Sequence, residues 1–531
     1  MHDIVIRNAE VIDGTGKPAN RSDVAVDEGR IAEVGDLSRS SAKHVIDAKG
    51  WAVAPGFIDM HSHADFSLPI WPTADSMLHQ GITTAVVGQC GLSPAPLLDE
   101  TRAEVVAALS GFFGEFVKDV PWHEWSSIGD YLNFLTRQGI SPNVLQLVGQ
   151  GVIRASVMGL GEGRADQGQM ATMKDQVVAA MAQGAIGLST GLIYPPGSFT
   201  ATEELIELTQ TVGECNGYYF SHIRGEGDTL LESVDEAIRI GREAGTSVQI
   251  SHFKAARKDN WDKSPKALQL IEKAQSEGLD VTADVYPYLA GSTSLVTMLP
   301  QWAHVGGPKE ILKRLADPAA RSKMSTDMQT GGFARGIEWS SVLITSSPNR
   351  TEYEGRYVSD LANQAGKPAY DWVFDALLKT QLDMGMAVFG MSEENRRREI
   401  QFPSMMICTD GFGLATTGPM ARGVPHPRNY GAFPRVLGRY VRDLQVLTLE
   451  EAVYKMTGLP AQKLRLKDRG LIRPGFTADL VVFDPAAVSD RATYDNPHRY
   501  AAGISHVLVN GQFVIRDGSH TGTKPGAALR I

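Results

Sequence analysis

The chain has 531 residues, of which 43% are hydrophobic and 21% are charged. This composition provides for a large buried core and excludes a mainly disordered chain. Lys and Arg together number 51 against 61 Asp and Glu, and the formal net charge of −10 argues against a protein that binds nucleic acid or an anionic membrane surface.

The few cysteines and the absence of apolar segments narrow the class of protein further. Cys90, Cys215 and Cys408 cannot form a disulfide framework, which favours a reducing compartment. Residues 1–14 contain no basic segment and no long apolar run, so we expect no signal peptide. Nowhere do about 18 consecutive apolar residues occur, so we expect no membrane-spanning helix. We therefore expect a cytoplasmic globular protein of enzyme size; its oligomeric state is left open.

The two ends of the chain have the pattern of short strands. Alternating or β-branched apolar runs punctuated by glycine occupy residues 4–47, and similar runs recur at 479–483 and 507–515. Asn510-Gly511 lies between apolar runs and predicts a tight hairpin, because both central residues of that turn need a positive φ. Neither end is large enough for a core of its own. We predict that residues 1–54 and 471–531 pair into one small β-sandwich-like domain, with the middle of the chain inserted between them.

The middle of the chain alternates apolar strands with helical patterns such as 173–183 and 232–244, which favours parallel βαβ units. Eight strands are predicted, at residues 57–58, 82–87, 144–148, 185–188, 218–221, 247–251, 280–284 and 405–409. The predicted fold class is therefore α/β, with residues 55–470 forming a (β/α)8 TIM barrel whose active site lies at the C-terminal strand ends. Residues 289–403, between strands seven and eight, are too many for a simple crossover and predict a partly helical inserted segment.

Candidate metal-binding side chains gather at the ends of the predicted strands. In an extended segment, residues two apart point the same way, so the two imidazoles of His61-Ser62-His63 can face one ion. One histidine at a strand end is more often structural than a ligand, but here one thiolate, four imidazoles and one carboxylate are predicted to converge, a donor set that suits zinc. These candidate ligands are His61, His63, Cys90, His222, His252 and Asp410.

Several motifs resemble one known family, the metal-dependent amidohydrolase superfamily. Residues 55–63 (PGFIDMHSH) and 473–483 (RPGFTADLVVF) carry this resemblance. A closer similarity, over nearly the whole chain, is to the D-aminoacylases, the N-acyl-D-amino acid amidohydrolases. The segments that carry it are 88–93, 187–192, 221–224, 251–254, 284–292, 409–411 and 426–431.

The resemblance implies how the metal is held. Many binuclear superfamily members bridge two metals with a carbamylated Lys on strand four, but residues 187–191 (GLSTG) contain no Lys, and Cys90 takes the bridging role instead. One tight zinc is implied at Cys90, His222 and His252. A second, weaker metal is implied at His61, His63, Cys90 and Asp410.

The expected mechanism follows from charge. Zinc lowers the pKa of a bound water to about 7 and polarises the scissile carbonyl. Asp410 is the expected catalytic residue, which accepts the water proton and passes it to the leaving amine.

The product amine carries a carboxylate, which requires cations near the metal. The resemblance implies a substrate-binding clamp of Lys254, Tyr286, Ser292 and Arg428. The loop 411–428 looks longer than the D-aminoacylase pattern, which leaves the side-chain pocket and the register of Arg428 open. A solvated surface charge is the simpler reading of any one Lys or Arg in a loop, and Arg224 and Glu226 fit a structural ion pair equally well.

We therefore predict zinc-dependent hydrolysis of N-acyl-D-amino acids to a carboxylate and a free D-amino acid. An alternative is a hydrolase of D-configured dipeptides, lactams or cyclic imides that uses the same metal site. A remote alternative is a non-catalytic, amidohydrolase-like assembly protein, which should lack the metal ligands. The preference for D over L substrates rests on the resemblance alone.

Overall fold

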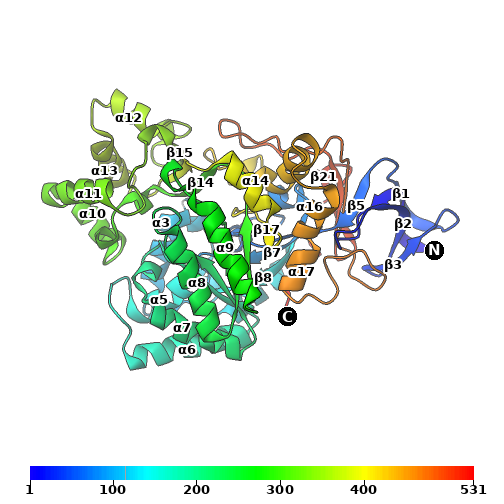
Figure 1. Ribbon diagram of the computed structural model, residues 1–531, viewed down its shortest axis with the longest axis horizontal. Coiled ribbons are helices and arrows are strands. Elements are labelled where there is room, and N and C mark those ends of the chain that lie inside the picture. The colour runs from blue at the N-terminus through cyan, green and yellow to red at the C-terminus, as the bar shows by residue number, and fades with distance from the viewer. Residues whose placement is uncertain (114) are drawn as a thin grey trace.

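The computed structural model describes residues 1–113 and 115–531. Its centre is a set of parallel strands surrounded by helices, with a mixed sheet at one end of the long axis and a unit that contains an antiparallel sheet at the other (Figure 1). Each of the eight strands predicted for the middle of the chain is present, the fourth displaced by two or three residues. Among the described residues, no helix combines the length and the apolarity needed to cross a lipid bilayer.

The parallel strands form two sheets that share one segment of chain. One sheet has the order β6 (Phe57–Asp59), β7 (Ile82–Val87), β8 (Asn143–Gln146). The other has the order β9 (Val148–Gly149), β10 (Gly187–Gly191), β11 (Tyr218–His222), β12 (Ser247–Ile250), β13 (Val281–Val285), β17 (Met405–Ile407). Because β9 begins two residues after β8 ends, one segment pairs with β7 and then with β10.

The outer strands β6 and β17 also meet just beyond their C-terminal ends. Ser62 and Gly411 form an isolated parallel bridge, and the Asp410 amide donates a hydrogen bond of 2.8 Å to the His61 carbonyl. The residues that follow β6 and β17, including candidate ligands, are therefore fixed to each other by the backbone.

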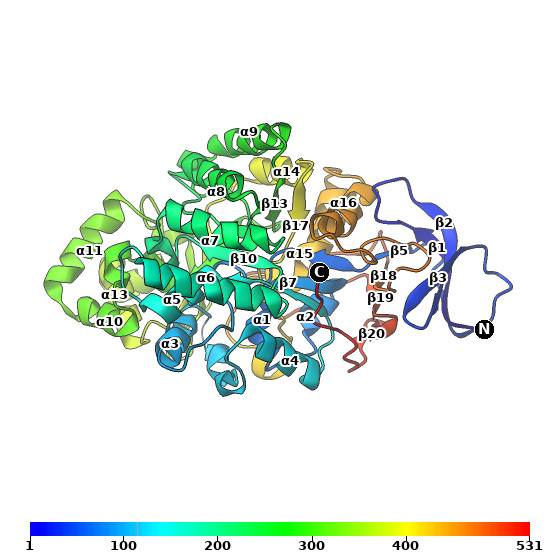
Figure 2. The same cartoon turned by 90° about the horizontal axis from the view of Figure 1, so that it is seen from below.

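Helices between the strands bury one apolar face against them. In α8 (Leu230–Ala244), Leu230, Val234, Ala237 and Ile238 are buried at helical spacing, while Glu232 is exposed. Gly245 ends this helix with a φ of +63°, the left-handed conformation that glycine adopts without strain. Other helices of this kind, seen from below in Figure 2, include α6 (Gln167–Ala182), α7 (Thr202–Glu214), α9 (Lys263–Ser276) and α14 (Glu393–Gln401).

Strands from both chain ends form one mixed sheet, in which most pairs are antiparallel. Strand β5 (Ala52–Pro55) pairs with β18 (Leu480–Phe483), which joins the N-terminal strands to the C-terminal ones. Their buried residues share one core, in which Ile6 and Val24 pack with Leu480 and Leu508. Where the sequence predicted a sandwich-like arrangement, the hydrogen bonds run through a single continuous sheet. Its other strands are β1 (His2–Val11), β2 (Asn20–Asp27), β3 (Arg30–Gly35), β4 (Ala42–Asp47), β19 (Ile504–Val509), β20 (Gln512–Arg516) and β21 (Ser519–His520).

The predicted hairpin at Asn510-Gly511 is confirmed. Both residues have positive φ, +49° and +76°, and they connect the antiparallel strands β19 and β20.

The chain between β13 and β17 contains a unit with its own core. Three antiparallel strands, in the order β14 (Ala290–Ser294), β16 (Gly385–Phe389), β15 (Val342–Ser346), pack against helices. These helices are α10 (Pro308–Ala316), α11 (Pro318–Thr330), α12 (Val358–Gln364) and α13 (Ala369–Lys379). Its core, which includes Leu315, Met324 and Phe374, is separate from that of the parallel strands. Figures 1 and 2 both place these helices at the end of the molecule opposite β1–β3.

Candidate metal centre and active site

The candidate ligands all lie at one end of the parallel strands. Each follows or ends a strand: His61 and His63 follow β6, Cys90 follows β7, His222 ends β11, His252 follows β12 and Asp410 follows β17. Because parallel strands of such a fold end at the same face, side chains from distant parts of the sequence meet there. All six residues predicted as metal ligands are brought together in this way.

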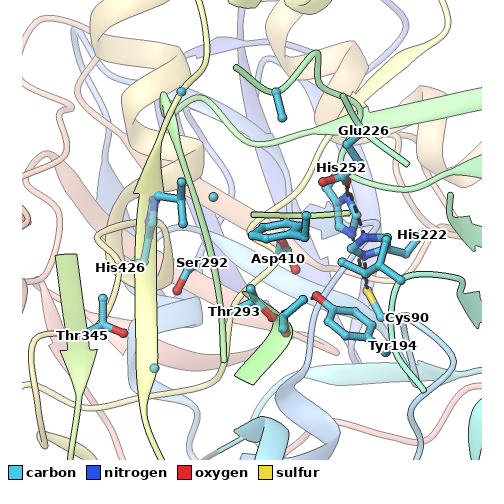
Figure 3. Close-up of a pocket in the computed structure, with 18 of the residues that line it drawn as sticks. Cys90, Tyr194, His222, Glu226, His252, Ser292, Thr293, Thr345, Asp410 and His426 are labelled. Carbon is cyan, nitrogen blue, oxygen red and sulfur yellow. Dashed lines mark hydrogen bonds and ion pairs between the residues drawn. The ribbon is translucent and has the colours of Figure 1, made fainter. Parts of the chain in front are cut away.

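A sulfur atom lies at the centre of the imidazoles. The Cys90 Sγ atom is 3.4 Å from His61 Nε2, 3.5 Å from His222 Nδ1 and 3.5 Å from His252 Nε2. Figure 3 shows Cys90 beside the imidazoles of His222 and His252. Bond lengths of about 2.3 Å to sulfur and about 2.0 Å to nitrogen around a tetrahedral zinc put these atoms roughly 3.5 Å apart. The donor set therefore fits a zinc ion in both chemistry and spacing.

Burial prepares these side chains for a cation. It lowers the pKa of His61 and His222 well below the ordinary value, so both imidazoles are neutral, which is the form that ligates metals. Burial also raises the pKa of the Cys90 thiol well above its ordinary value. A divalent cation between these groups would restore the thiolate, because the positive charge offsets the cost of desolvating sulfur.

The Asp410 carboxylate joins this cluster on the side of His63. Its Oδ1 atom lies 3.5 Å from His61 Nε2 and 3.4 Å from His63 Nε2, and its Oδ2 atom is paired with Arg428 Nη1 at 2.7 Å. Burial acts to raise the pKa of Asp410, but Arg428 and His252 reverse that effect and hold the pKa well below its ordinary value. The carboxylate is therefore ionised near neutral pH.

Three of the candidate ligands have unusual backbone conformations. Cys90, His252 and Asp410 have positive φ values of +57°, +36° and +49°. Residues other than glycine avoid this region, and where it occurs the surrounding structure must enforce it, often at functional sites. For His252, the enforcing group is the Asp284 carboxylate, which accepts a hydrogen bond of 2.7 Å from the His252 amide.

Glu226 belongs to the site although the sequence did not assign it. Its Oε1 atom lies 3.1 Å from His252 Nδ1 and 3.7 Å from His222 Nε2, and it forms an ion pair with Lys254. The alternative of an Arg224–Glu226 ion pair is wrong, because Arg224 pairs with Glu236 of α8 at 2.8 Å. The available signal was the position of Glu226, four residues beyond a candidate ligand at a strand end.

Two further buried carboxylates contact candidate ligands. Asp284 is the last but one residue of β13, and its Oδ1 atom lies 3.8 Å from His61 Nδ1. Asp59 ends β6 and accepts hydrogen bonds from the amides of Thr409 and His61, at 2.9 and 3.2 Å. Burial raises the pKa of Asp59 to about 7. Neither residue was assigned a role from the sequence, although Asp59 lies two residues before His61 and Asp284 ends the predicted strand 280–284.

The residues predicted to clamp a carboxylate line the same cavity, whose volume is about 740 Å³. Lys254 and Arg428 are each 6% exposed. They lie on the ring of Tyr286, with the Lys254 Nζ and Arg428 Cζ atoms 5.7 and 4.8 Å from its centre. Ser292, on β14, also lines the cavity, and its hydroxyl donates to the Met386 carbonyl at 3.0 Å. Tyr288 is directed elsewhere and donates to Asp490 at 3.2 Å.

Comparison with known proteins agrees with the sequence motifs. The Amidohydrolase family profile matches residues 44–515. A D-aminoacylase of Alcaligenes xylosoxydans xylosoxydans is 36% identical over 99% of this chain and 97% of its own length. An N-acyl-D-glutamate deacylase of the same organism is 36% identical over 99% of this chain and 96% of its own.

A solved structure gives the same result for the fold. The crystal structure of the N-acyl-D-glutamate deacylase of Bordetella bronchiseptica, complexed with zinc and a phosphonate mimic of the tetrahedral intermediate, is 35% identical and superposes with a TM-score of 0.85 over 100% of both chains. The predicted mixed α/β fold is thereby confirmed, as is the resemblance to D-aminoacylases. The chain belongs to the amidohydrolase family.

Proposed function

We propose that this protein hydrolyses the amide bond of N-acyl-D-amino acids and uses zinc to do so. The observation that carries the proposal is the convergence in one cavity of a thiol–imidazole cluster, the Asp410 carboxylate and the buried cations Lys254 and Arg428. The relatives support the class of reaction, since they include a D-aminoacylase and an N-acyl-D-glutamate deacylase whose structure holds zinc.

Two overlapping sets of side chains would hold metal. Cys90, His222 and His252 are the proposed tight zinc site, because sulfur and nitrogen ligands with zinc-like spacing converge there. His61, His63, Cys90 and Asp410 are the proposed second, weaker site. The chemistry that a bound zinc ion supplies is Lewis acidity, which polarises a carbonyl and lowers the pKa of water to about 7.

Asp410 is the proposed proton carrier. Its carboxylate is ionised, lies beside His61 and His63, and faces the cavity. It accepts the proton of the attacking water and then gives it to the leaving nitrogen, because an amine leaves an amide readily only once it is protonated. Arg428 holds the carboxylate in position through the 2.7 Å ion pair.

Lys254, Tyr286, Ser292 and Arg428 are the proposed clamp for the substrate α-carboxylate. Both cations already have carboxylate partners, Glu226 for Lys254 and Asp410 for Arg428, which fixes their positions before a substrate arrives. Burial raises the pKa of Tyr286, so its hydroxyl is a neutral hydrogen-bond donor. For Ser292 to join the clamp, its hydroxyl must turn away from the Met386 carbonyl.

We also propose how the chain is divided. Residues 55–470 would form one closed (β/α)8 barrel, a division supported by the segment shared between β8 and β9 and by the bridge between Ser62 and Gly411. Residues 1–54 and 471–531 would form the small β domain, and 289–403 would contain the inserted segment, with α14 packing against α9 and β17 as a crossover helix does. A cytoplasmic location remains a prediction from the cysteine content.

Hydrolysis assays test the proposal. The purified protein should hydrolyse N-acetyl-D-methionine, should be much less active on N-acetyl-L-methionine, and should contain about one equivalent of zinc. Turnover of hydantoins alone would show that cyclic imides are the substrates. Less than about half an equivalent of zinc together with no turnover would favour the non-catalytic alternative.

A further inference from the structure

We infer that the amino acid released by this enzyme has an uncharged, apolar side chain, so that the substrate carries one negative charge, its α-carboxylate. This inference rests on the proposed function and adds the class of side chain. It follows from the partners of the cations that line the cavity and from the apolar walls beside the candidate metal ligands.

The two cations next to the candidate ligands are already assigned to other anions. Lys254 is paired with Glu226, and Arg428 is paired with the catalytic carboxylate of Asp410 at 2.7 Å. Each is 6% exposed, so its charge acts in a desolvated environment, where one substrate carboxylate can be bound strongly. When the α-carboxylate occupies this pair, neither cation is left for a second one.

The other cations of the described cavity lining are bound by groups of the protein. Arg224 donates to Glu236 and to the Ser198 and Thr200 carbonyls, three acceptors that together engage its whole guanidinium group. Arg257 and Arg335 share the Asp228 carboxylate, at 2.5 and 2.6 Å. A carboxylate on the substrate side chain would have to compete with these existing pairs.

Two cations of the cavity lining, Arg335 and Arg422, are largely exposed to solvent. The side chains of Arg335 and Arg422 are 53% and 47% exposed, and the latter lies 3.9 Å from Asp119. Exposed ion pairs of this kind contribute little binding free energy because water and salt screen them. Neither arginine is therefore a buried cation whose attraction could offset the free energy of desolvating a second carboxylate.

Apolar groups occupy the walls next to the candidate ligands. The Tyr194 ring, which Figure 3 shows beside His222, meets the imidazole edge-on with 5.0 Å between the ring centres. The centre of the Phe412 ring lies 5.8 Å from that of His63. Buried apolar side chains also line the cavity; they are Leu92, Leu192, Leu299, Leu414 and Met420. A substrate side chain that extends beyond the clamp therefore meets hydrocarbon and aromatic surface, which favours an apolar group.

Paired substrates separate the effect of charge from that of size. We expect kcat/KM for N-acetyl-D-methionine and N-acetyl-D-leucine to exceed that for N-acetyl-D-glutamate and N-acetyl-D-aspartate by at least about 100-fold, because a charged group enters an apolar site without a partner. N-Acetyl-D-glutamine has nearly the shape of N-acetyl-D-glutamate but no charge. It should be hydrolysed at least about 10-fold faster than the glutamate derivative.

Two variants test the outer cations. In Arg335→Gln and in Arg422→Gln, the ratio of kcat/KM for N-acetyl-D-methionine to kcat/KM for N-acetyl-D-glutamate should stay within about twofold of the wild-type ratio. A glutamate or aspartate derivative hydrolysed as well as the methionine derivative would overturn the inference while the proposed function stands. A selective loss of glutamate hydrolysis in either variant would also overturn it. Failure to hydrolyse any N-acetyl-D-amino acid would instead overturn the proposed function itself.

Discussion

The Oε1 atom of Glu226 lies 3.1 Å from the Nδ1 atom of His252, on the side of the imidazole opposite the Cys90 sulfur. The same oxygen is 3.7 Å from His222 Nε2, so one carboxylate contacts two proposed zinc ligands (Figure 3). Carboxylates that contact ligating histidines in this way fix the orientation of the ring and increase its basicity.

Replacing Glu226 should therefore weaken metal binding without removing a ligand. In Glu226→Gln, we expect the affinity for zinc, measured by competition with a chelator, to fall by about 10- to 100-fold. Glu236→Gln is the matched control, because Glu236 pairs with Arg224 and contacts no candidate ligand. Equal zinc affinity in both variants would show that Glu226 has no role in orienting the imidazoles.

Replacing Cys90 and replacing Asp410 should have different effects on zinc content and on activity. Cys90→Ala removes the atom at the centre of three imidazoles, so the protein should lose its zinc as well as its activity. Asp410→Asn should keep zinc at Cys90, His222 and His252 but lose about 100- to 10,000-fold in kcat, because an amide cannot carry the proton. Metal analysis and kinetics on the same samples distinguish the two effects.

Cys215→Ala provides the control for these substitutions. Cys215 is a free cysteine at the end of α7, away from the cluster. This variant should retain full zinc and activity. Near-normal activity in Asp410→Asn would show that another group carries the proton.

The Tyr286 hydroxyl can be tested separately from its ring. Tyr286→Phe keeps the aromatic face on which Lys254 and Arg428 lie but removes the donor proposed for the substrate carboxylate. We expect KM for an N-acyl-D-amino acid to rise by about 10-fold with little change in kcat, since a hydrogen bond to a charged group is lost. In Tyr288→Phe, which removes a hydroxyl that donates to Asp490, KM should not change. A KM for Tyr286→Phe that is unchanged from wild type, like that for Tyr288→Phe, would place Tyr286 outside the clamp.

The sequence was informative about the ligands for a physical reason. His61, His63, Cys90, His222, His252 and Asp410 each end or follow a predicted apolar strand, and parallel strands bring such positions to one face. Strand prediction was therefore sufficient to predict that these side chains meet.

Ion-pair partners, and strands without an apolar pattern, could not be predicted in this way. Arg224 and Glu226 are two positions apart, yet Arg224 pairs with Glu236, twelve residues away on α8, and Glu226 turns to Lys254. The strand β14 was also missed, because Ala-Gly-Ser-Thr-Ser has no apolar alternation and is stabilised by its pairing with β16. Both features depend on contacts between segments that sequence patterns do not encode.

A glycine next to Cys90 should be essential to the shape of the site. A Cβ atom added at Gly191, the last residue of β10, would lie 2.0 Å from the Cys90 carbonyl oxygen. Since this contact is with backbone, Gly191→Ala must displace Cys90, whose left-handed conformation leaves little freedom. We expect lower zinc content and loss of activity. Gly35→Ala, where no atom lies within 4 Å of the added Cβ, should behave as wild type.

His304 should make the stability of the protein dependent on pH. Burial among apolar residues of the inserted unit lowers its pKa to about 4, whereas the unfolded chain has an ordinary histidine pKa near 6.5. Between these two values the unfolded state binds more protons, so the stabilising contribution is complete above about pH 6.5 and is lost as the pH falls toward 4. From pH 7.5 to 5 the loss amounts to about 2 kcal/mol.

In His304→Gln, the free energy of unfolding measured with denaturant should therefore fall by about 2 kcal/mol less than in wild type over this range. His123→Gln is the control, because the His123 side chain is 81% exposed, and its pH dependence should match that of wild type. An unchanged pH dependence in His304→Gln would mean that His304 is protonated to the same extent in the folded and unfolded states.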